Sequence, residues 1–246
     1  MMTPLIEFIN IHKRFGTSHV LKGLNLSIYN GESIAVIGKS GTGKSVLLKH
    51  IIGLVQQDSG EILIEGRPLN KLSAIEKQTF FKKLSYMFQD NALFDFMNIY
   101  DNIALPLIEN SSVAKNQVKN KVLKRMDQLG LKGIERKFPS QLSGGMRKRV
   151  ALARAIVTDP KIVLFDEPTT GLDPVRKKKV HSMIQEYQEK FEFTAVIVSH
   201  DIPEIFNVVQ RVALLDDGII KFEGAKKDIL DSHSEILNDF IAGKDI

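Results

Sequence analysis

The sequence predicts an α/β fold organised around a parallel sheet, and three features support this prediction. Short apolar runs with the length of buried strands occur at Ile34–Ile37, Ile162–Phe165 and Ala195–Val198, and buried parallel strands are typically apolar on both faces. Helix-like segments alternate with such runs in the second half of the chain. The 246 residues are 43% hydrophobic and 26% charged, which is ordinary globular composition and enough for one sizeable core or two small ones.

Several classes of protein are excluded by what the sequence lacks. No apolar run approaches the roughly 20 residues that a membrane-spanning helix needs. The N-terminal MMTPLIEFIN has no basic segment followed by an apolar one, so it does not resemble a secretory signal. The chain contains no cysteine, which excludes a disulfide framework and a thiolate metal site. These features fit a cytosolic protein.

The net charge of +5 does not identify a partner by itself. A basic balance is compatible with nucleic acid, with an anionic membrane surface or with neither. The basic clusters are short, one at 119–125 and one at Arg176–Lys179, and each is best explained as a solvated helix face.

The first third of the chain is predicted to be rich in β structure. Asn30-Gly31 lies between the strand-like runs Leu24–Ile28 and Ile34–Ile37, and Asn-Gly between two such runs is a hairpin signal. A second hairpin is predicted where Glu61–Glu65 is followed by Gly66.

The middle of the chain is predicted to be helical. Ser73 and Glu76 have the spacing of a capping box, which predicts a helix that continues to about Lys83. The stretch from about Asn98 to Val157 has a helical pattern, with breaks at Gly130, Gly133 and Pro139. Because the sequence shows no internal repeat and no long linker, we interpret this helical stretch as an insertion within one domain.

Strands and helices then alternate to the end of the fold. A helix is predicted near Val175–Lys190, a strand at Thr194–Val198 and a further helix near Pro203–Val209. A closing hairpin is predicted from Arg211–Leu215 and Ile219–Phe222.

Residues 38–45 have the pattern G-x-x-x-x-G-K-[ST], preceded by a strand-like run and followed by a helix-like one. Small residues let the backbone curl so that successive N–H groups point at phosphate oxygens. Lys44 can reach the β- and γ-phosphates, and Ser45 can offer a hydroxyl to Mg²⁺. A glycine-rich turn with these four fixed positions should arise by chance in about one chain of this length in a hundred. The pattern therefore predicts a nucleotide site formed by Gly38, Lys39, Ser40, Gly41, Thr42, Gly43, Lys44 and Ser45.

Two carboxylates follow the buried strand that begins at Lys161. Ligands bind at the carboxyl edge of a parallel sheet, where such a strand ends. Asp166 is placed to hold Mg²⁺ directly or through water, and Glu167 can accept a proton from an attacking water molecule. An isolated Asp-Glu pair is often only a solvated strand end, but beside a phosphate-binding loop we favour the catalytic interpretation.

A second anion site is indicated by Ser143, Gly144 and Gly145, which precede a predicted helix at about Met146–Val157. A helix N-terminus attracts anions. Because the chain has only one phosphate loop, a second phosphate-facing helix N-terminus suggests contact with the nucleotide of another copy in a dimer. Considered alone, however, Ser-Gly-Gly before a helix is a weak signal and is better explained as a helix cap.

Two further polar residues follow predicted strands at the same sheet edge. His200 comes after the run Val196–Ser199 and could contact a γ-phosphate or orient Glu167. Gln89 follows the run Leu84–Phe88, and its amide could contact Mg²⁺ or the attacking water molecule. Each side chain could equally be structural.

Taken in this order, the motifs resemble the ABC ATPase family over nearly the whole chain. The resemblance implies a P-loop NTPase fold in which one domain, 1–246, has a parallel core sheet, an N-terminal antiparallel β subdomain and a helical insertion at about 90–157. It implies ATP and Mg²⁺ as cofactors, two copies that enclose ATP between them, and a membrane permease as partner. It assigns Gly38–Ser45 to Walker A, Gln89 to the Q-loop, Ser143–Gly145 to the signature motif, Asp166 to Walker B, Glu167 to the catalytic base, Asp173 to the D-loop and His200 to the switch loop.

Two positions depart from the usual family pattern. Phe15 lies where the family places an aromatic residue, more often Tyr, that stacks on adenine; Phe keeps the π-face. Met146 stands where the signature usually ends in Gln. Since Ser143 and the glycines are retained, we expect activity to survive, but Met146 argues against the commonest solute importers.

The departure at Met146 resembles the Mla-type branch, whose ATPases serve phospholipid transporters that maintain outer-membrane lipid asymmetry. The segments Phe88–Phe94, Asn98–Pro106 and Ser199–Glu204 are also similar to that branch. The resemblance implies a phospholipid cargo, a place at the cytoplasmic face of the bacterial inner membrane, and a periplasmic lipid-binding subunit as a further partner.

Three alternatives share some of these motifs. An ABC ATPase of another importer or exporter has the same catalytic residues and differs only in cargo. Members that act on ribosomes generally carry two cassettes and DNA-repair members need a long coiled coil, whereas this chain has neither, so we expect no nucleic-acid partner. An ATP sensor that does not hydrolyse ATP is disfavoured because Glu167 and His200 are both present.

Overall fold

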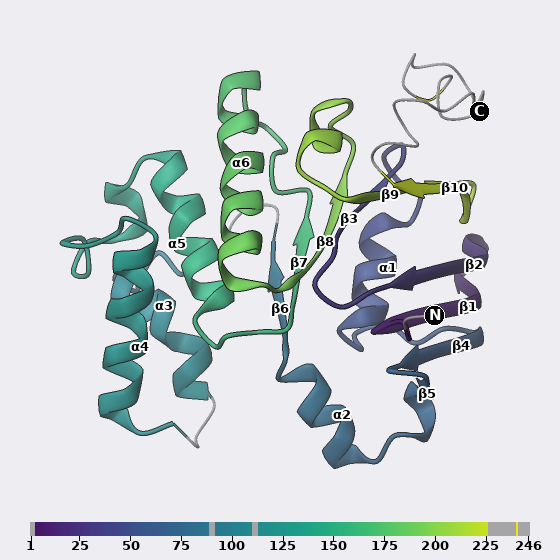
Figure 1. The fold of residues 1–246 in the computed structure, drawn as a ribbon, viewed down its shortest axis with the longest axis horizontal. Coiled ribbons are helices and arrows are strands. Elements are labelled where there is room, and N and C mark those ends of the chain that lie inside the picture. Colours follow the sequence, from purple (N-terminus) through teal and green to yellow (C-terminus); the bar gives the residue numbers. More distant parts are fainter. Residues whose placement is uncertain (1–2, 89–91, 110–112, 226–239, 241–246) are drawn as a thin grey trace.

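The computed structural model of the chain describes residues 3–88, 92–109, 113–225 and 240. It contains two sheets that lie beside each other (Figure 1). The smaller, four-stranded sheet is antiparallel and has the strand order β2-β1-β4-β5. Its strands are β1 (Ile6–Phe15), β2 (Ser18–Ile28), β4 (Ser59–Ile64) and β5 (Arg67–Pro68). The pairing of β4 with β5 confirms the hairpin predicted at Gly66.

The larger sheet has six strands in the order β10-β9-β3-β8-β7-β6. All of its pairings are parallel except that of β10 with β9, so the predicted parallel sheet and closing hairpin are both confirmed. Its strands are β3 (Ser33–Ile37), β6 (Leu84–Met87), β7 (Ile162–Asp166), β8 (Thr194–Ser199), β9 (Arg211–Asp216) and β10 (Ile219–Ala225).

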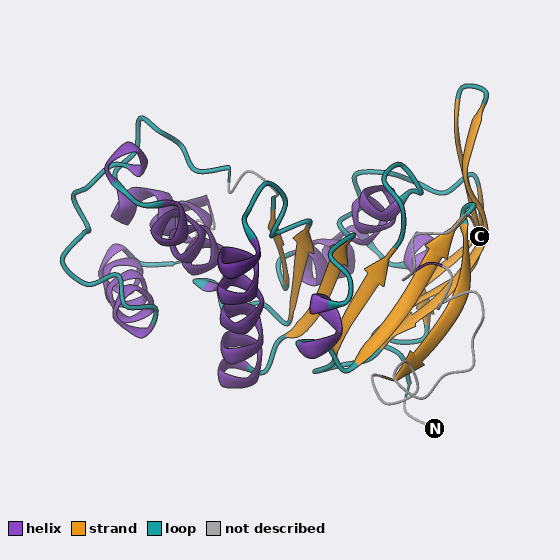
Figure 2. Ribbon diagram, turned by 90° about the horizontal axis from the view of Figure 1, so that it is seen from above, coloured by secondary structure: helices purple, strands orange, loops and turns teal. Residues whose placement is uncertain are grey.

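Helices cover both faces of the larger sheet, as the view from above shows (Figure 2). The helices α3, α4 and α5 gather at one end of the molecule, in the part of the chain where we predicted an insertion (Figure 1). The α-helices are α1 (Lys44–Ile51), α2 (Ala74–Phe81), α3 (Ile99–Glu109), α4 (Lys115–Gln128), α5 (Gly144–Ile156) and α6 (Pro174–Phe191). Short 3₁₀ turns occupy Leu69–Lys71, Pro139–Gln141 and Glu204–Asn207.

The central strands are apolar on both faces because each face contributes to a different core. Along β7, Ile162 and Leu164 belong to the core shared with α1 and the antiparallel sheet. Val163 and Phe165, which alternate with them, belong to the core shared with α3 to α6. Side chains of a strand point alternately to opposite faces, so the continuous apolar runs that predicted these strands are a consequence of double coverage.

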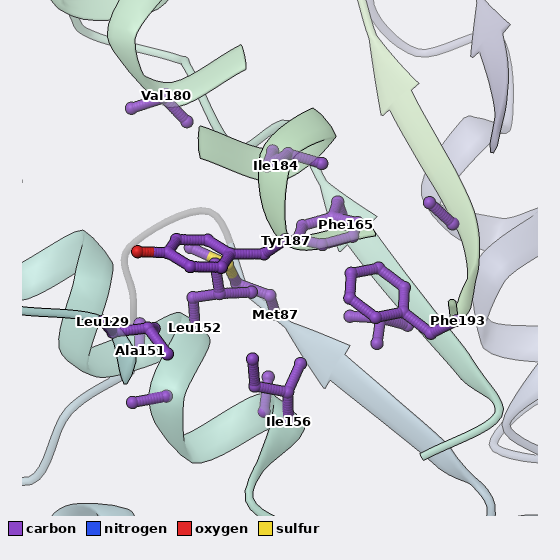
Figure 3. Packing of buried hydrophobic residues seen from close by; sticks show 14 of the residues in the cluster. Met87, Leu129, Ala151, Leu152, Ile156, Phe165, Val180, Ile184, Tyr187 and Phe193 are labelled. Carbon is purple, nitrogen blue, oxygen red and sulfur yellow. The ribbon is translucent and has the colours of Figure 1, made fainter. Parts of the chain in front are cut away.

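The second core joins the helical end of the molecule to the sheet (Figure 3). The rings of Phe165 and Phe193 lie 6.3 Å apart, and Tyr187 of α6 packs over the same cluster. Leu152 and Ile156 of α5 reach it from the other side. This packing fixes α5 and α6 relative to the strands that they cover.

The hairpin predicted at Asn30-Gly31 is wrong. Although the chain does turn there, with Gly31 at φ +76°, the two flanking strands belong to different sheets. Strand β2 pairs with β1, whereas β3 pairs with β8 and β9. The local turn signal was correct, but β3 is apolar on both faces and is therefore buried at the centre of the parallel sheet.

The helix predicted near Pro203–Val209 is also wrong in type. The segment forms a 3₁₀ turn over Glu204–Asn207, closed by bonds such as Phe206 N–H to the Pro203 carbonyl at 3.0 Å. The next strand, β9, begins at Arg211. The capping box of Ser73 and Glu76 is confirmed, and its helix ends at Phe81, earlier than predicted.

None of the helices in the described part of the chain has both the length and the apolar content needed to span a bilayer.

The second core gives a stability prediction. Phe193 is 1% exposed and packs on Phe165, so Phe193→Ala should lower the free energy of unfolding by about 3–5 kcal/mol. Urea denaturation measures this change. The matched control is Leu54→Ala, because Leu54 is 71% exposed and its loss should cost about 0.5 kcal/mol or less. Equal stability of the two variants would contradict the packing described for Phe193.

Candidate active site

The predicted site residues come together at one edge of the larger sheet. Strands β3, β7 and β8 run parallel, so the segments that follow them, which begin at Gly38, Glu167 and His200, emerge side by side. Ligands of α/β proteins bind at this carboxyl edge. Gln89 follows the parallel strand β6 in sequence, but it lies outside the described residues.

The loop 38–45 requires glycine at specific positions. Gly43 has φ +103°, and a Cβ placed there would lie 2.9 Å from Val20 of β2. A Cβ on Gly38 would lie 2.3 Å from the carbonyl oxygen of Leu215 on β9. The hydroxyl of Thr42 donates to the Lys39 carbonyl at 3.0 Å and closes the turn. The backbone of the loop is thus wedged between the two sheets, where a larger residue would not fit.

Lys44 is the first residue of α1 and its side chain is buried, at 4% exposure. Its ammonium donates to the carbonyls of Gly38 and Lys39, both at 2.8 Å, and lies 3.7 Å from Glu167 Oε1. Burial lowers the pKa of Lys44, and the carboxylate of Glu167 partly offsets this effect. The ammonium is therefore held inside the loop, where an anionic ligand would meet a poorly hydrated cation.

Ser45 and Asp166 bring oxygen ligands together. The Ser45 hydroxyl donates to Asp166 Oδ1 at 2.8 Å. The second oxygen of the same carboxylate accepts a hydrogen bond from the hydroxyl of Tyr86, at 2.6 Å. A carboxylate beside a hydroxyl is a donor set that suits Mg²⁺, which prefers oxygen ligands and keeps several water molecules. The residues present therefore fit the predicted cation.

Glu167 points away from Asp166 because its backbone is in the left-handed region, with φ +47°. Its N–H donates to the Val198 carbonyl at 3.0 Å, which ties the strand end of β7 to β8. Its Oε2 accepts from Thr170 at 2.8 Å and lies 2.9 Å from His200 Nδ1. Of the two roles considered for His200, the observed contact is the one that orients Glu167.

The loop after His200 is fixed by a buried carboxylate. Asp201 is 5% exposed and accepts hydrogen bonds from the Thr169 hydroxyl and the Lys177 ammonium. Burial by itself would raise the pKa of Asp201, but these two donors outweigh it and hold the pKa below its usual value. Because Thr169 lies just after Glu167 and Lys177 lies on α6, Asp201 ties the loop after His200 to the segment that follows Glu167.

Ser143 and Asp173 both cap helices. Ser143 accepts from the Met146 N–H at 3.3 Å at the start of α5, and Asp173 accepts from the Arg176 N–H at 2.9 Å at the start of α6. A Cβ added at Gly145 would meet no described atom within 4 Å. An open cavity of about 850 Å³ lies between α5 and α6, and its lining includes Ser143, Gly144 and Gly145 but no residue of the 38–45 loop. Within one chain, the predicted second anion site is therefore separate from the first.

Phe15 lies at the end of β1 and is 48% exposed. The ammonium of Lys13 lies 5.4 Å from the centre of its ring. The neighbouring strand β2 contacts the phosphate loop through Val20, so the hairpin that carries Phe15 borders the predicted site. Its contact with adenine stays a prediction.

Sequence reasoning missed Tyr86, Thr170 and Thr169, all of which hold acidic residues of the site. One feature of the sequence could have pointed to Tyr86. A tyrosine in a strand that packs among apolar residues usually needs a hydrogen-bond acceptor for its hydroxyl. The two threonines follow Glu167 after Pro168, but nothing in their local pattern indicated which of them would face it.

Comparison with known proteins identifies relatives along the whole chain. Residues 21–170 match the ABC transporter family. The probable ribonucleotide transport ATP-binding protein mkl of Mycobacterium leprae is 38% identical over 100% of this chain and 71% of its own. The intermembrane phospholipid transport ATP-binding protein MlaF of Haemophilus influenzae is 35% identical over 99% of this chain and 92% of its own. The chloroplastic protein TRIGALACTOSYLDIACYLGLYCEROL 3 of Arabidopsis thaliana is 36% identical over 97% and 74%.

Solved structures agree with this assignment. The chain resembles cbiO1 of Clostridium perfringens, part of the ABC transporter complex cbiONQ, with a TM-score of 0.85 and 26% identity over 97% of this chain and 95% of that one. It resembles the ATP-binding cassette MJ0796, solved as a dimer bound to ADP and Pi, with a TM-score of 0.76 and 30% identity over 90% and 98%. The family match covers more than half of the chain and brings together the phosphate loop and the acid pair described above. The chain therefore belongs to the ABC transporter family, as an ATP-binding subunit that hydrolyses ATP.

Proposed function

We propose that this ATPase powers the transport of phospholipid across a bacterial cell envelope. The relatives divide between a ribonucleotide transporter subunit and phospholipid transporter subunits. The observation that carries the lipid proposal is the extent of the MlaF match, which spans 99% of this chain and 92% of MlaF, against 71% of mkl. Met146 in the signature motif supports the same branch.

The positions of the side chains support the following hydrolytic cycle. Lys44 and the N–H groups of the 38–45 loop bind the phosphates. Ser45 and Asp166 would hold Mg²⁺, which would offset negative charge on the phosphates. Glu167 takes a proton from the attacking water molecule. His200 and Thr170 keep the Glu167 carboxylate oriented for that step.

A second copy of the chain completes each ATP site. The N-terminus of α5 presents Ser143, Gly144 and Gly145 at an open surface away from the chain's own phosphate loop. A head-to-tail pair would place this helix start against the nucleotide of the other copy, where its partial positive charge favours phosphate. The dimeric MJ0796 cassette supports this arrangement. We treat residues 1–246 as one such domain, with the helices of 90–157 as its insertion.

An integral membrane permease is the proposed second partner. Phe88, Phe94 and Phe96 are 47%, 39% and 76% exposed, and they flank the position of Gln89 in the chain. Exposed aromatic side chains gathered in one segment mark an interaction surface. A permease docked there would hold the ATPase peripherally at the cytoplasmic face of the inner membrane, with a periplasmic lipid-binding subunit on the far side.

Transport of a ribonucleotide or another small solute is the second candidate function, favoured by the 38% identity to mkl. The catalytic residues are common to both candidates. They differ in the cargo and in the subunits that deliver it.

Replacing the proposed base tests the chemical step. We expect Glu167→Gln to lower the ATP hydrolysis rate by about 10²–10⁴-fold, because general-base assistance has this size, while ATP binding is retained. Phosphate release and the binding of a fluorescent ATP analogue measure the two properties. The control is Glu61→Gln, an exposed residue of β4, which should leave both unchanged. A Glu167→Gln protein that hydrolyses ATP near the wild-type rate would show that another group is the base.

Mixing two inactive variants tests the shared site. Ser143→Asp keeps a side chain that caps a helix but adds negative charge beside the phosphates, and Lys44→Ala removes the phosphate-binding ammonium. Each protein alone should be inactive, and the mixture should regain part of the activity, since a mixed dimer contains one intact pair of Lys44 and Ser143. Ser143→Asn, which caps without charge, is the matched control. A mixture as inactive as its components would contradict the head-to-tail arrangement.

Purification of the complex from membranes tests the cargo. We expect a permease and a lipid-binding periplasmic subunit to co-purify in mild detergent, with phospholipid detected by mass spectrometry. Phospholipid should stimulate hydrolysis by this complex, whereas added ribonucleotides other than ATP should not. A soluble solute-binding protein in place of the lipid-binding subunit would overturn the lipid proposal and leave the ATPase assignment intact.

A further inference from the structure

Tyr86 shares the carboxylate of Asp166 with Ser45. The tyrosine hydroxyl donates to Oδ2 at 2.6 Å, and the serine hydroxyl donates to Oδ1 at 2.8 Å. The proposed cycle uses Ser45 and Asp166 but gives Tyr86 no part. Both oxygens of the carboxylate are nevertheless held, one by the phosphate loop and one by the edge strand β6.

The register of the sheet explains this contact. Strand β6 runs parallel to β7 with Tyr86 opposite Leu164, so Asp166, two residues further along β7, lies on the same face as Tyr86. A diagonal neighbour of this kind is within reach of an aromatic side chain. The Tyr86 ring packs against the core shared with α1 and the antiparallel sheet, and its centre lies 4.5 Å from that of the Phe88 ring. The hydroxyl is therefore carried to the end of β7 by a ring that is itself held in place.

The hydroxyl can act only as a donor in this position. The carboxylate oxygen of Asp166 can only accept, so the Tyr86 hydroxyl is the donor across the 2.6 Å between the two oxygens. A protonated phenol beside an ionised carboxylate donates its hydrogen to it, and hydrogen bonds to charged groups are stronger than neutral ones.

We propose that Tyr86 is a positioning residue for the magnesium site, fixing the Asp166 carboxylate so that its remaining lone pairs face the cation. This inference rests on the proposed role of Asp166 as a magnesium ligand. Without the tyrosine hydroxyl, Ser45 alone would hold the carboxylate. Part of the binding free energy of Mg²⁺ would then be spent on ordering the second carboxylate oxygen.

The test measures binding in a protein that does not turn over ATP. In a Glu167→Gln background, the dissociation constant of a fluorescent ATP analogue is measured with Mg²⁺ and with EDTA. We expect Tyr86→Phe, which removes only the hydroxyl, to reduce the enhancement of affinity by Mg²⁺ about 3- to 10-fold, the size expected for the loss of one typical hydrogen bond. Affinity in EDTA should not change. Tyr29→Phe is the matched control, because Tyr29 lies in the turn between the two sheets and packs on Arg211.

Steady-state kinetics with Glu167 intact give a second readout. Tyr86→Phe should raise the KM for Mg²⁺ by a similar factor, and kcat should recover at saturating Mg²⁺. A purely structural role would instead lower kcat or the melting temperature without a selective effect on Mg²⁺.

Asp166→Ala distinguishes failure of the proposed metal site from failure of the role proposed for Tyr86. If Asp166→Ala leaves the Mg²⁺ enhancement unchanged, the proposed metal site is wrong. If Asp166→Ala abolishes the enhancement while Tyr86→Phe preserves it, only the role of Tyr86 is overturned. In support of the inference, Tyr86→Phe should have no further effect on the enhancement in the Asp166→Ala protein.

Discussion

The structure depends on the parallel alignment of β3, β8, β7 and β6, which are covered on both faces. Double coverage requires apolar side chains at almost every position of these strands, so polar residues can appear only after each strand ends. Since the strands run in one direction, those polar residues emerge at a single edge. The phosphate loop, the acid pair and His200 are neighbours in space for this reason, although more than 160 positions separate the first from the last.

Adjacent carboxylates can serve different steps because the backbone separates them. Asp166 is the last residue of β7 and faces Ser45 and Tyr86. Glu167 enters the left-handed region, turns away and faces Lys44 and His200. A positive φ is uncommon for a residue other than glycine. Here the hydrogen bond from the Glu167 N–H to the Val198 carbonyl of β8 stabilises this backbone conformation. Tyr86 and Thr170 then hold these two carboxylates by hydrogen bonds, and Asp201 holds the loop that follows His200.

Much of the fold could be predicted because its signals are local. The capping box of Ser73 and Glu76 needs only neighbouring residues, and the apolar runs of β7 and β8 report burial directly. The wrong predictions concern segments whose local pattern is compatible with more than one structure. Asn30-Gly31 specifies a turn but not the strand that pairs afterwards, and the apolar pattern after Pro203 is compatible with the 3₁₀ turn that forms there. The roles given to Gln89, Phe15 and Asp173 stay predictions.

The sequence by itself determined the phosphate loop, the acid pair and the order of strands and helices, because glycine spacing, charge and apolar periodicity act over a few residues. Only the tertiary structure decided which side chains meet. It placed Tyr86 on Asp166 through the register of β6 and β7, and His200 on Glu167 through the pairing of β7 with β8. It also separated Ser143–Gly145 from the phosphate loop of the same chain. Contacts of this kind join residues far apart in sequence, and they are fixed by sheet register and core packing, which no local pattern encodes.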